Sequence, residues 1–554
     1  MAQRGPISGN ERVAVIQGDN LAWATKAQVI AILAAQDRNP GKPPMNRWTS
    51  AKGDETFLAI QGGQRVYLTA ADLTAWLAAP GSTPEAAGGV ALTTITGAEM
   101  LPVGLNSGDY GYLDIGDVLG VTGGGAVATW KVAANRGESM SDSVGGTATN
   151  TRHVQRTRHY MGKAKDGYTA WRATLGNYLV NGSNAETSTG NTITYQMAME
   201  IPGAPTPVVR LTAGGNNSMS LLVGTEQAFD DVLPAAFGLT SFAPGTVFWY
   251  RAIIDHVSNA TRVGNGEVGT GTPAGEAVYY CAPANADSEQ LMNSGALVAG
   301  TMATGAMLHM PVRSEGFAVK HDMAVGLLGT SIQQGNADNQ VSGSPVGVPV
   351  GGRGGPFRRA LEAAGVPYCS TARAGSQIAN YRTGANLRRS IYALCDHFIN
   401  EYVTNDFASN RTSDQVVADL YAEHVLIRTA RPDAWIWQTT CIPRCDGGGS
   451  VSPTDPSTMV PGLRFSNTAT GYRPTFNALL RSGGGPAAVN ADAIIDTSLA
   501  MEWPTSADRF DVDPGPVALT DTGYIHPVTA GALRMKVPTD AALAARLALI
   551  DRAA

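Results

Sequence analysis

The sequence predicts a multidomain protein with small α+β repeats at the N-terminus, an all-β sandwich in the middle and a three-layer α/β domain with a mainly parallel sheet at the C-terminus. A pattern of 44 residues recurs within residues 1–120. Residues 151–316 alternate apolar and polar side chains between Gly, Pro and Asn turns, and strands then alternate with amphipathic helices over 317–554. The length of 554 residues also exceeds what one hydrophobic core supports.

Composition excludes several classes of function. Charged residues make up 16% of the chain and the formal net charge is −6, so no basic signature for nucleic acid is present. No apolar run approaches the roughly 18 residues that span a bilayer, and the N-terminus lacks the apolar stretch of a signal peptide. We therefore expect no nucleic acid, no membrane insertion, and synthesis as a soluble cytoplasmic product. Cys441 and Cys445 flank a short turn, either as two thiols or as a small disulfide or half of a metal site.

The N-terminal repeat begins at Gly9, again at Gly53, and more weakly at Gly97. The first two copies, GNERVAVIQGDNLAWATKAQVIAILAA and GDETFLAIQGGQRVYLTAADLTAWLAA, align without gaps. Each copy predicts two strands joined by a turn and then a short helix, capped by Thr25, Thr69 and Asp114 in turn. Each copy is too small to bury an apolar face alone. The copies must therefore stack on each other or on another chain.

These repeats resemble modules near the N-termini of bacteriophage tail fibre and tailspike proteins. There the pattern G-x-E-x-x-x-(V/I)-x-Q-G-G, followed by a strand and a capped helix, recurs in tandem. The resemblance implies that residues 1–120 attach the protein to other virion tail proteins, that the protein resides on the virion, and that it is a homo-oligomer, usually a trimer. The alternative is a generic β/α repeat used for oligomerisation.

Residues 121–150 are rich in Gly, Thr, Ala and Ser, which predicts a linker. Residues 151–316 follow as the predicted sandwich, with a possible role in carbohydrate binding. Trp171, Trp249 and Tyr250 could stack on sugar rings there, but core positions are the better expectation for each one.

Residues 317–554 predict strands alternating with helices around a mainly parallel sheet. We expect helices at 357–365, 386–402 and 413–431 and two more at the chain end, 526–536 and 539–551. Two long loops, 335–356 and 444–462, are expected to wall a groove at the catalytic face.

Ser331 stands at the end of the first buried strand of this region, where parallel sheets place their active sites. A serine on a turn out of such a strand exposes its hydroxyl beside backbone N–H groups that can hold an oxyanion. The serine needs a base. His526 opens the segment 526–536 and is placed on the loop that leads into its helix, whereas His397 and His424 fall within predicted helices.

Four blocks in order resemble the SGNH (GDSL-type) hydrolase family. The first block, usually Gly-Asp-Ser, is Gly329-Thr330-Ser331. The resemblance implies that Ser331 is the nucleophile and that its N–H, the N–H of Gly375 and the side chain of Asn405 form the oxyanion hole. His526, followed by Pro527, fits the last block as general base.

The sequence departs from the family pattern at three positions. Thr330 replaces the Asp before the serine, Val403 replaces a Gly, and Gly523 stands where Asp should lie three residues before His526. Asp521 lies five residues before the histidine. Either the loop is longer and Asp521 still orients the imidazole, or a Ser-His dyad uses a backbone carbonyl instead.

Together the resemblances imply a tail fibre or tailspike protein that binds a host receptor and carries a serine esterase without metal or organic cofactor. Its expected substrate is an O-acetylated host cell-surface polysaccharide, and the protein is expected to be located on the virion. Two alternatives stay open: an inactive SGNH-fold receptor-binding protein, and an intracellular lipase-like or thioesterase enzyme with unrelated repeats.

Overall fold

The structure is a computed structural model. It describes residues 12–17, 20–25, 47–48, 56–61, 64–69, 100–104, 110–114, 128–138, 142–144, 150–164, 167–181, 184–257, 262–264, 266–267, 275–305, 307–318, 323–338, 354–446, 452–468, 471–513 and 517–553. The chain divides into two compact units, one over residues 1–127 and one over residues 128–552. The predicted boundary between 316 and 317 falls inside the second unit.

The first unit contains two matching hairpins. One pairs β1 (Arg12–Gln17) with β2 (Asn20–Thr25), and the other pairs β4 (Thr56–Gln61) with β5 (Gln64–Thr69). Corresponding ends lie 44 residues apart, which is the offset between the first two copies in the sequence. The two hairpins share one sheet because β1 also pairs antiparallel with β4.

The third copy forms a separate small sheet. In it β6 (Met100–Gly104) pairs antiparallel with β7 (Tyr110–Asp114), and β3 (Arg47–Trp48) runs parallel to β7. The helices expected after each hairpin lie outside the described residues.

The second unit begins with two antiparallel sheets that face each other. The larger has the order β16 (Val208–Leu211), β15 (Ile193–Glu200), β19 (Val247–Asp255), β11 (Arg152–Tyr160), β22 (Ala277–Cys281), β23 (Ala303–Thr304), with β17 (Met219–Leu221) also on β15. The smaller has the order β18 (Glu226–Ala228), β12 (Ala170–Gly176), β25 (Arg313–Ala318), β8 (Thr129–Val132). Three two-stranded sheets accompany them: the hairpin of β13 (Tyr178–Val180) with β14 (Glu186–Ser188), and the pairs of β10 (Asp142–Val144) with β20 (Arg262–Gly264) and of β21 (Gly266–Glu267) with β24 (Met307–Leu308).

One apolar core lies between the two large sheets and receives alternate side chains from both. Trp171 of β12 and Tyr250 of β19 meet in it, where the indole N–H donates to the tyrosine hydroxyl at 2.8 Å. Trp249 is also buried, and Arg156 stacks on its ring. The three aromatics are therefore core residues, and the idea that they stack on sugars at the surface is wrong.

Residues 128–138 correct the predicted linker. β8 pairs with β25 of the smaller sandwich sheet, and β9 (Gly137–Glu138) extends the parallel sheet of the α/β part. Val132 at the end of β8 and Ala133 after it are fully buried. Composition alone does not separate small residues packed in such a junction from those of a flexible connection.

The α/β part is built on a six-stranded sheet in which every pair is parallel, as the sequence predicts. Its order is β32 (Ala493–Ile495), β29 (Trp435–Thr439), β28 (His397–Asn400), β26 (Val325–Leu328), β27 (Tyr368–Ser370), β9. Neighbouring residues on each strand enter opposite cores: Leu327 and Ile399 join one cluster, whereas Leu328 and Phe398 join the other. Both faces of the sheet are therefore covered.

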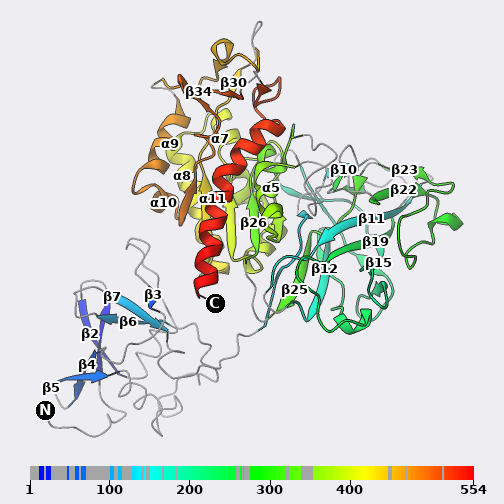
Figure 1. The fold of residues 1–554 in the computed structure, drawn as a ribbon, viewed down its shortest axis with the longest axis horizontal. Helices are drawn as coiled ribbons and strands as arrows, with labels where there is room; N and C mark the ends of the chain where they lie inside the picture. The colour runs from blue at the N-terminus through cyan, green and yellow to red at the C-terminus, as the bar shows by residue number, and fades with distance from the viewer. Residues whose placement is uncertain are drawn as a thin grey trace. The chain divides into compact units, whose positions relative to one another are not determined.

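Helices cover the sheet on its two faces (Figure 1). One face carries α6 (Ile378–Gly384), η4 (Leu387–Ala393), α8 (Ser413–Ala430) and α9 (Tyr472–Arg481), and the other carries α5 (Pro356–Ala364) and α11 (Thr529–Ala553). Shorter elements complete this part: α4 (Ser331–Gln334), α7 (Thr404–Ala408), α10 (Gly485–Ala488), η5 (Pro456–Thr458), and the hairpins β30 (Cys445–Asp446) with β31 (Val460–Pro461), β33 (Glu502–Trp503) with β34 (Ser506–Phe510) and β35 (Val512–Asp513) with β36 (Val517–Ala518). In the sandwich part, η2 (Pro234–Phe237) and η3 (Ala286–Ser288) lie in loops. None of the described helices is long and apolar enough to cross a membrane.

Two helix predictions are corrected. The expected helix over 386–402 is a 3-10 helix followed by strand β28, so His397 lies in the sheet. All four residues of β28 are buried, and a short run buried on both faces has no periodicity that separates strand from helix. The two expected C-terminal helices are one helix, α11, with Pro538 inside it.

We predict that Val132→Ala lowers the apparent free energy of unfolding by about 2 kcal/mol, because it removes buried methyl groups from the core next to Leu328. Urea denaturation measures the change. Thr129→Ala, at the exposed start of the same strand, is the matched control and should stay within about 0.5 kcal/mol of wild type. Equal stability of the Val132 variant and wild type would show that this segment is a linker after all.

Candidate active site

Three adjacent strands of the parallel sheet deliver the candidate residues. β27, β26 and β28 are neighbours, and their carboxyl ends lie on one edge of the sheet. Ser331 follows β26, Gly375 follows β27 and Asn405 follows β28. The order of the strands thus brings together residues that lie up to 74 positions apart in the chain.

The turn between β26 and α4 presents Ser331. Thr330 is the N-cap of this short helix, and its side chain accepts a hydrogen bond from Ile332 N–H at 3.4 Å. Gly329 has no room for a side chain, because an added Cβ would lie 2.7 Å from both Gln333 Cβ and Glu401 Oε2. Within the described residues, no hydrogen bond uses the Ser331 N–H, so this donor is available beside its own hydroxyl.

A continuous chain of hydrogen bonds joins three side chains. His526 Nε2 lies 2.9 Å from Ser331 Oγ, and His526 Nδ1 lies 2.9 Å from Asp521 Oδ2. The Ser331 residue is 6% exposed, whereas the side chains of His526 and Asp521 are 23% and 25% exposed. The site is therefore lined by groups that a solute can reach.

The loop from Asp521 to His526 explains how a carboxylate five residues away reaches the imidazole. The loop is closed at its ends, since Asp521 N–H donates to His526 O at 2.9 Å. Tyr524 sits in the left-handed region with φ 54°, and its N–H donates to Asp521 O at 3.0 Å. Asp521 Oδ1 accepts from Ile525 N–H and His526 N–H, which leaves Oδ2 for the ring. The two additional residues are absorbed in this turn.

The carboxyl group of Asp521 is held in its ionised form. Burial would raise the pKa of its carboxyl, but the hydrogen bond from His526 and those from the backbone N–H groups outweigh burial and lower it to about 2. The carboxylate therefore stays ionised wherever an imidazole titrates, so it can hold the Nδ1–H and favour an imidazolium.

The donors expected on the neighbouring strands converge on one turn. Gly375 has φ 78°, is exposed, and its N–H forms no hydrogen bond with the rest of the described chain. Asn405 Nδ2 donates to the carbonyl of Ser376 at 3.0 Å. Arg373 N–H on the same turn donates to Gly329 O at 3.2 Å, which ties the turn to the segment that carries the serine.

Glu401 is a site residue that the sequence did not single out. Its carboxylate accepts from Thr330 N–H and from Thr330 Oγ1, each at 2.8 Å. Burial raises the pKa of Glu401 to about 7, against the opposing effect of these two donors. Thr330, which stands where the SGNH pattern has Asp, is thus held by a carboxylate from the adjacent strand. The available signal was an acidic residue directly after the short segment Phe398-Ile399-Asn400.

The loop after β29 supports the histidine loop from outside. Cys445 N–H donates to Tyr524 O at 3.1 Å, and Tyr524 packs in the same cluster as Ile442 and Met459. Part of the predicted loop 444–462 therefore lies beside the histidine, whereas most of the loop 335–356 falls outside the described residues. Cys441 and Cys445 are both buried free thiols, and burial raises both pKa values.

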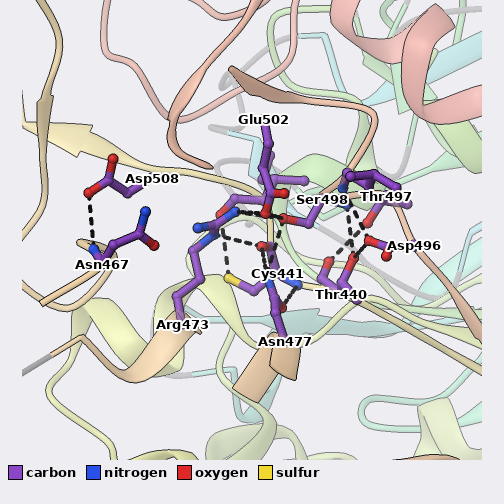
Figure 2. A network of polar contacts seen from close by, with 12 residues as sticks. Thr440, Cys441, Asn467, Arg473, Asn477, Asp496, Thr497, Ser498, Glu502 and Asp508 are labelled. Atoms are coloured by element: carbon purple, nitrogen blue, oxygen red, sulfur yellow. Dashed lines mark hydrogen bonds and ion pairs between the residues drawn. The ribbon is translucent and has the colours of Figure 1, made fainter. Parts of the chain in front are cut away.

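A buried polar network fixes the segments that follow β29 and β32 (Figure 2). Arg473 is 1% exposed, and its guanidinium donates to Cys441 O at 2.9 Å and to Glu502 Oε1 at 2.5 Å. Ser498 Oγ also donates to Glu502 Oε1, at 2.6 Å. Asn477 exchanges hydrogen bonds with the backbone of Cys441. This network holds the chain on its way to the loops that carry Cys445 and Asp521.

The arrangement is suited to acyl transfer. A serine hydroxyl hydrogen-bonded to an imidazole can lose its proton as it attacks a carbonyl carbon, and a carboxylate on the other ring nitrogen stabilises the imidazolium that forms. A free N–H group, such as that of Ser331, is the kind of donor that holds an oxyanion. Among the described residues, no group of three or more His, Cys, Asp or Glu is arranged to hold a metal ion.

Comparisons with known proteins give neighbours in structure only. No family model and no curated protein matches the chain. Similar solved structures include a family two carbohydrate esterase from Clostridium thermocellum (10% identity, 76% of this chain and 99% of that chain, TM-score 0.30) and one from Cellvibrio japonicus (11%, 76% and 96%, TM-score 0.29). A GDSL-like lipase from Bacteroides thetaiotaomicron matches at 14% identity over 42% of this chain and 90% of that chain, with a TM-score of 0.26. At such scores we base the function on the site geometry alone.

We predict that Ser331 reacts covalently with a fluorophosphonate, and that Asp521→Asn slows this reaction roughly 10³- to 10⁴-fold by losing the carboxylate that orients the ring. Intact-protein mass spectrometry over time measures both rates. Ser331→Ala should take up no label, and Ser218→Ala, at an exposed serine of the sandwich part, should react like wild type. A rate for the Asp521 variant close to wild type would favour the Ser-His dyad.

Proposed function

We propose that this protein is a serine carboxylic-ester hydrolase. One observation carries the proposal: the continuous hydrogen-bond chain from Asp521 through His526 to Ser331 at the carboxyl edge of a parallel sheet. Ser331 is assigned as nucleophile, His526 as general base and acid, and Asp521 as the residue that orients the imidazole. The N–H groups of Ser331 and Gly375 and the side chain of Asn405 are assigned to the oxyanion hole.

The reaction follows from these positions. Ser331 Oγ attacks the ester carbonyl carbon while its proton passes to His526 Nε2, and the carbonyl oxygen becomes an oxyanion held by the three donors. The C–O bond to the alcohol then breaks, and His526 returns the proton to the leaving alcohol. Water attacks the acyl-enzyme with His526 again as base, which releases the carboxylic acid and restores Ser331. Every group needed comes from the chain.

For the substrate, we propose an O-acetylated polysaccharide of a host cell surface, and for the protein a place on a phage tail as a receptor-binding tail fibre or tailspike, usually a trimer. The tandem N-terminal repeats and their resemblance to virion-attachment modules support this. The two hairpins at equivalent positions also support it, because the first two copies of the repeat each form the same antiparallel hairpin. The partly exposed side chains of His526 and Asp521 are compatible with a substrate attached to a polymer.

Two alternatives make different demands. An inactive receptor-binding protein would keep the fold and bind polysaccharide without turnover. The hydrogen-bonded chain of three side chains disfavours it, because a site without turnover has no need to hold an ionised carboxylate on the imidazole. An intracellular lipase-like or thioesterase enzyme would share the chemistry but would not associate with a virion.

We expect the purified protein to release acetate from O-acetylated bacterial surface polysaccharides, and Ser331→Ala to release none because it lacks the attacking oxygen. Acetate is quantified enzymatically against a chemically deacetylated sample, with Ser218→Ala, at an exposed serine of the sandwich part, as the active control. Absence of release from every polysaccharide tested, while the chain hydrolyses long-chain acyl esters or thioesters, would contradict the deacetylase and support the third alternative.

We also expect the full chain to be part of the virus particle. Immunogold electron microscopy of purified virions with antibodies against residues 354–446 should label the tail. A deletion of residues 1–120 should abolish labelling, because the repeats are proposed to make the attachment. Particles without label, or label that persists after the deletion, would contradict virion attachment through the repeats.

A further inference from the structure

A hairpin of the sandwich part reaches the turn that carries Gly375. β13 and β14 pair antiparallel, and between them Asn184 N–H donates to Asn181 O at 2.9 Å. Asn184 has φ 65° and is 1% exposed, although it lies on a loop. Its amide Nδ2 donates to the hydroxyl of Ser376, which belongs to the α/β part.

Ser376 is a hub for the proposed oxyanion turn. Its carbonyl accepts from Asn405 Nδ2 at 3.0 Å, and its N–H donates to Arg373 O at 3.0 Å. Its hydroxyl donates to Tyr402 at 2.9 Å while accepting from Asn184. Ser376 directly follows Gly375, so any shift of its hydroxyl is passed to the neighbouring N–H.

The hairpin is itself held in a defined position. Glu186 accepts hydrogen bonds from the backbone N–H groups of Asn386, Leu387 and Arg388, between 2.8 and 3.0 Å. Arg388 is fully buried, and its guanidinium donates to Glu186 at 3.2 Å and to Asn184 O at 2.5 Å. A buried ion pair surrounded by further hydrogen bonds fixes geometry well, because removing either partner leaves an uncompensated charge.

The two parts also approach too closely for side chains. An added Cβ on Gly384, at the end of α6, would lie 2.8 Å from both Ala185 Cα and Asn184 O. The glycine therefore lets the hairpin backbone pack against the end of the helix that begins two residues after Ser376. The contact between the hairpin and the turn has little freedom to slide.

We propose that Asn184 is a positioning residue for the esterase reaction: it acts through Ser376 to hold Gly375 N–H and Asn405 Nδ2 where the oxyanion forms. The sandwich part then completes the active site and is more than a separate binding module. The inference rests on the proposed function. Asn184 does not touch the reacting atoms, so its effect should fall on the transition state and not on ground-state binding.

The test uses Asn184→Gly in the full chain, because glycine keeps the left-handed backbone while the side chain with its amide is removed. With p-nitrophenyl acetate, a substrate too small to need the sandwich, we expect kcat to fall roughly 10- to 100-fold with KM nearly unchanged. Asn490→Gly is the matched control, since Asn490 is also left-handed, with φ 52°, and lies outside the site. Thermal unfolding monitors the fold of each variant.

A double-mutant cycle with Ser376→Ala tests whether Asn184 acts through the Ser376 hydroxyl. Because Asn184 is proposed to act through the Ser376 hydroxyl, Ser376→Ala should itself lower kcat, and adding Asn184→Gly should change it little further. Should Asn184→Gly fail to fold, Ser376→Ala alone carries the test, and wild-type kcat in that variant overturns the proposal.

The outcomes separate this inference from the proposed function. If the wild-type protein turns over the ester and the Asn184→Gly variant has the same kcat, the positioning role is overturned and the esterase assignment stands. Effects of Asn184→Gly and Ser376→Ala that multiply independently also overturn it. A wild-type protein without any ester turnover overturns both the esterase and the inference that depends on it.

Discussion

The hydrogen bond between Ser331 Oγ and His526 Nε2 joins two segments 195 residues apart, and the rest of the site is arranged around it. On one side, a strand buried on both faces ends in a turn that has no room for a side chain at Gly329. On the other, a loop closed by its own backbone hydrogen bonds holds the imidazole and its carboxylate together. Neither segment alone has the chemistry, since serine is a weak nucleophile until a base accepts its proton.

The parallel sheet supplies the second constraint. Because β27, β26 and β28 are neighbours, the turns that follow them, which carry Gly375, Ser331 and Asn405, meet at one edge of the sheet. Two further contacts support these turns: Glu401 accepts a hydrogen bond from Thr330 N–H beside the serine, and Asn184 of the sandwich hairpin donates to the hydroxyl of Ser376. Catalytic geometry of this kind depends on such supporting contacts.

The sequence could predict what local patterns encode, including the parallel sheet and the residues that follow its strands. It could not decide the role of Asp521, because the loop closure that brings Oδ2 to the ring depends on a left-handed Tyr524 that no residue type signals. It misassigned His397 because a four-residue strand buried on both faces has no period. Asn184 was invisible for another reason: its partner lies 192 positions away, and only the fold brings the two together.

The structure of the protein with a phosphonate bound covalently to Ser331 tests this account most directly, because the phosphonyl oxygen stands in for the oxyanion. We expect that oxygen to lie about 2.7–3.1 Å from Ser331 N, Gly375 N and Asn405 Nδ2, with His526 still bonded to Asp521. A phosphonyl oxygen that points to solvent, away from all three donors, would contradict the account, as would an imidazole that has separated from Asp521.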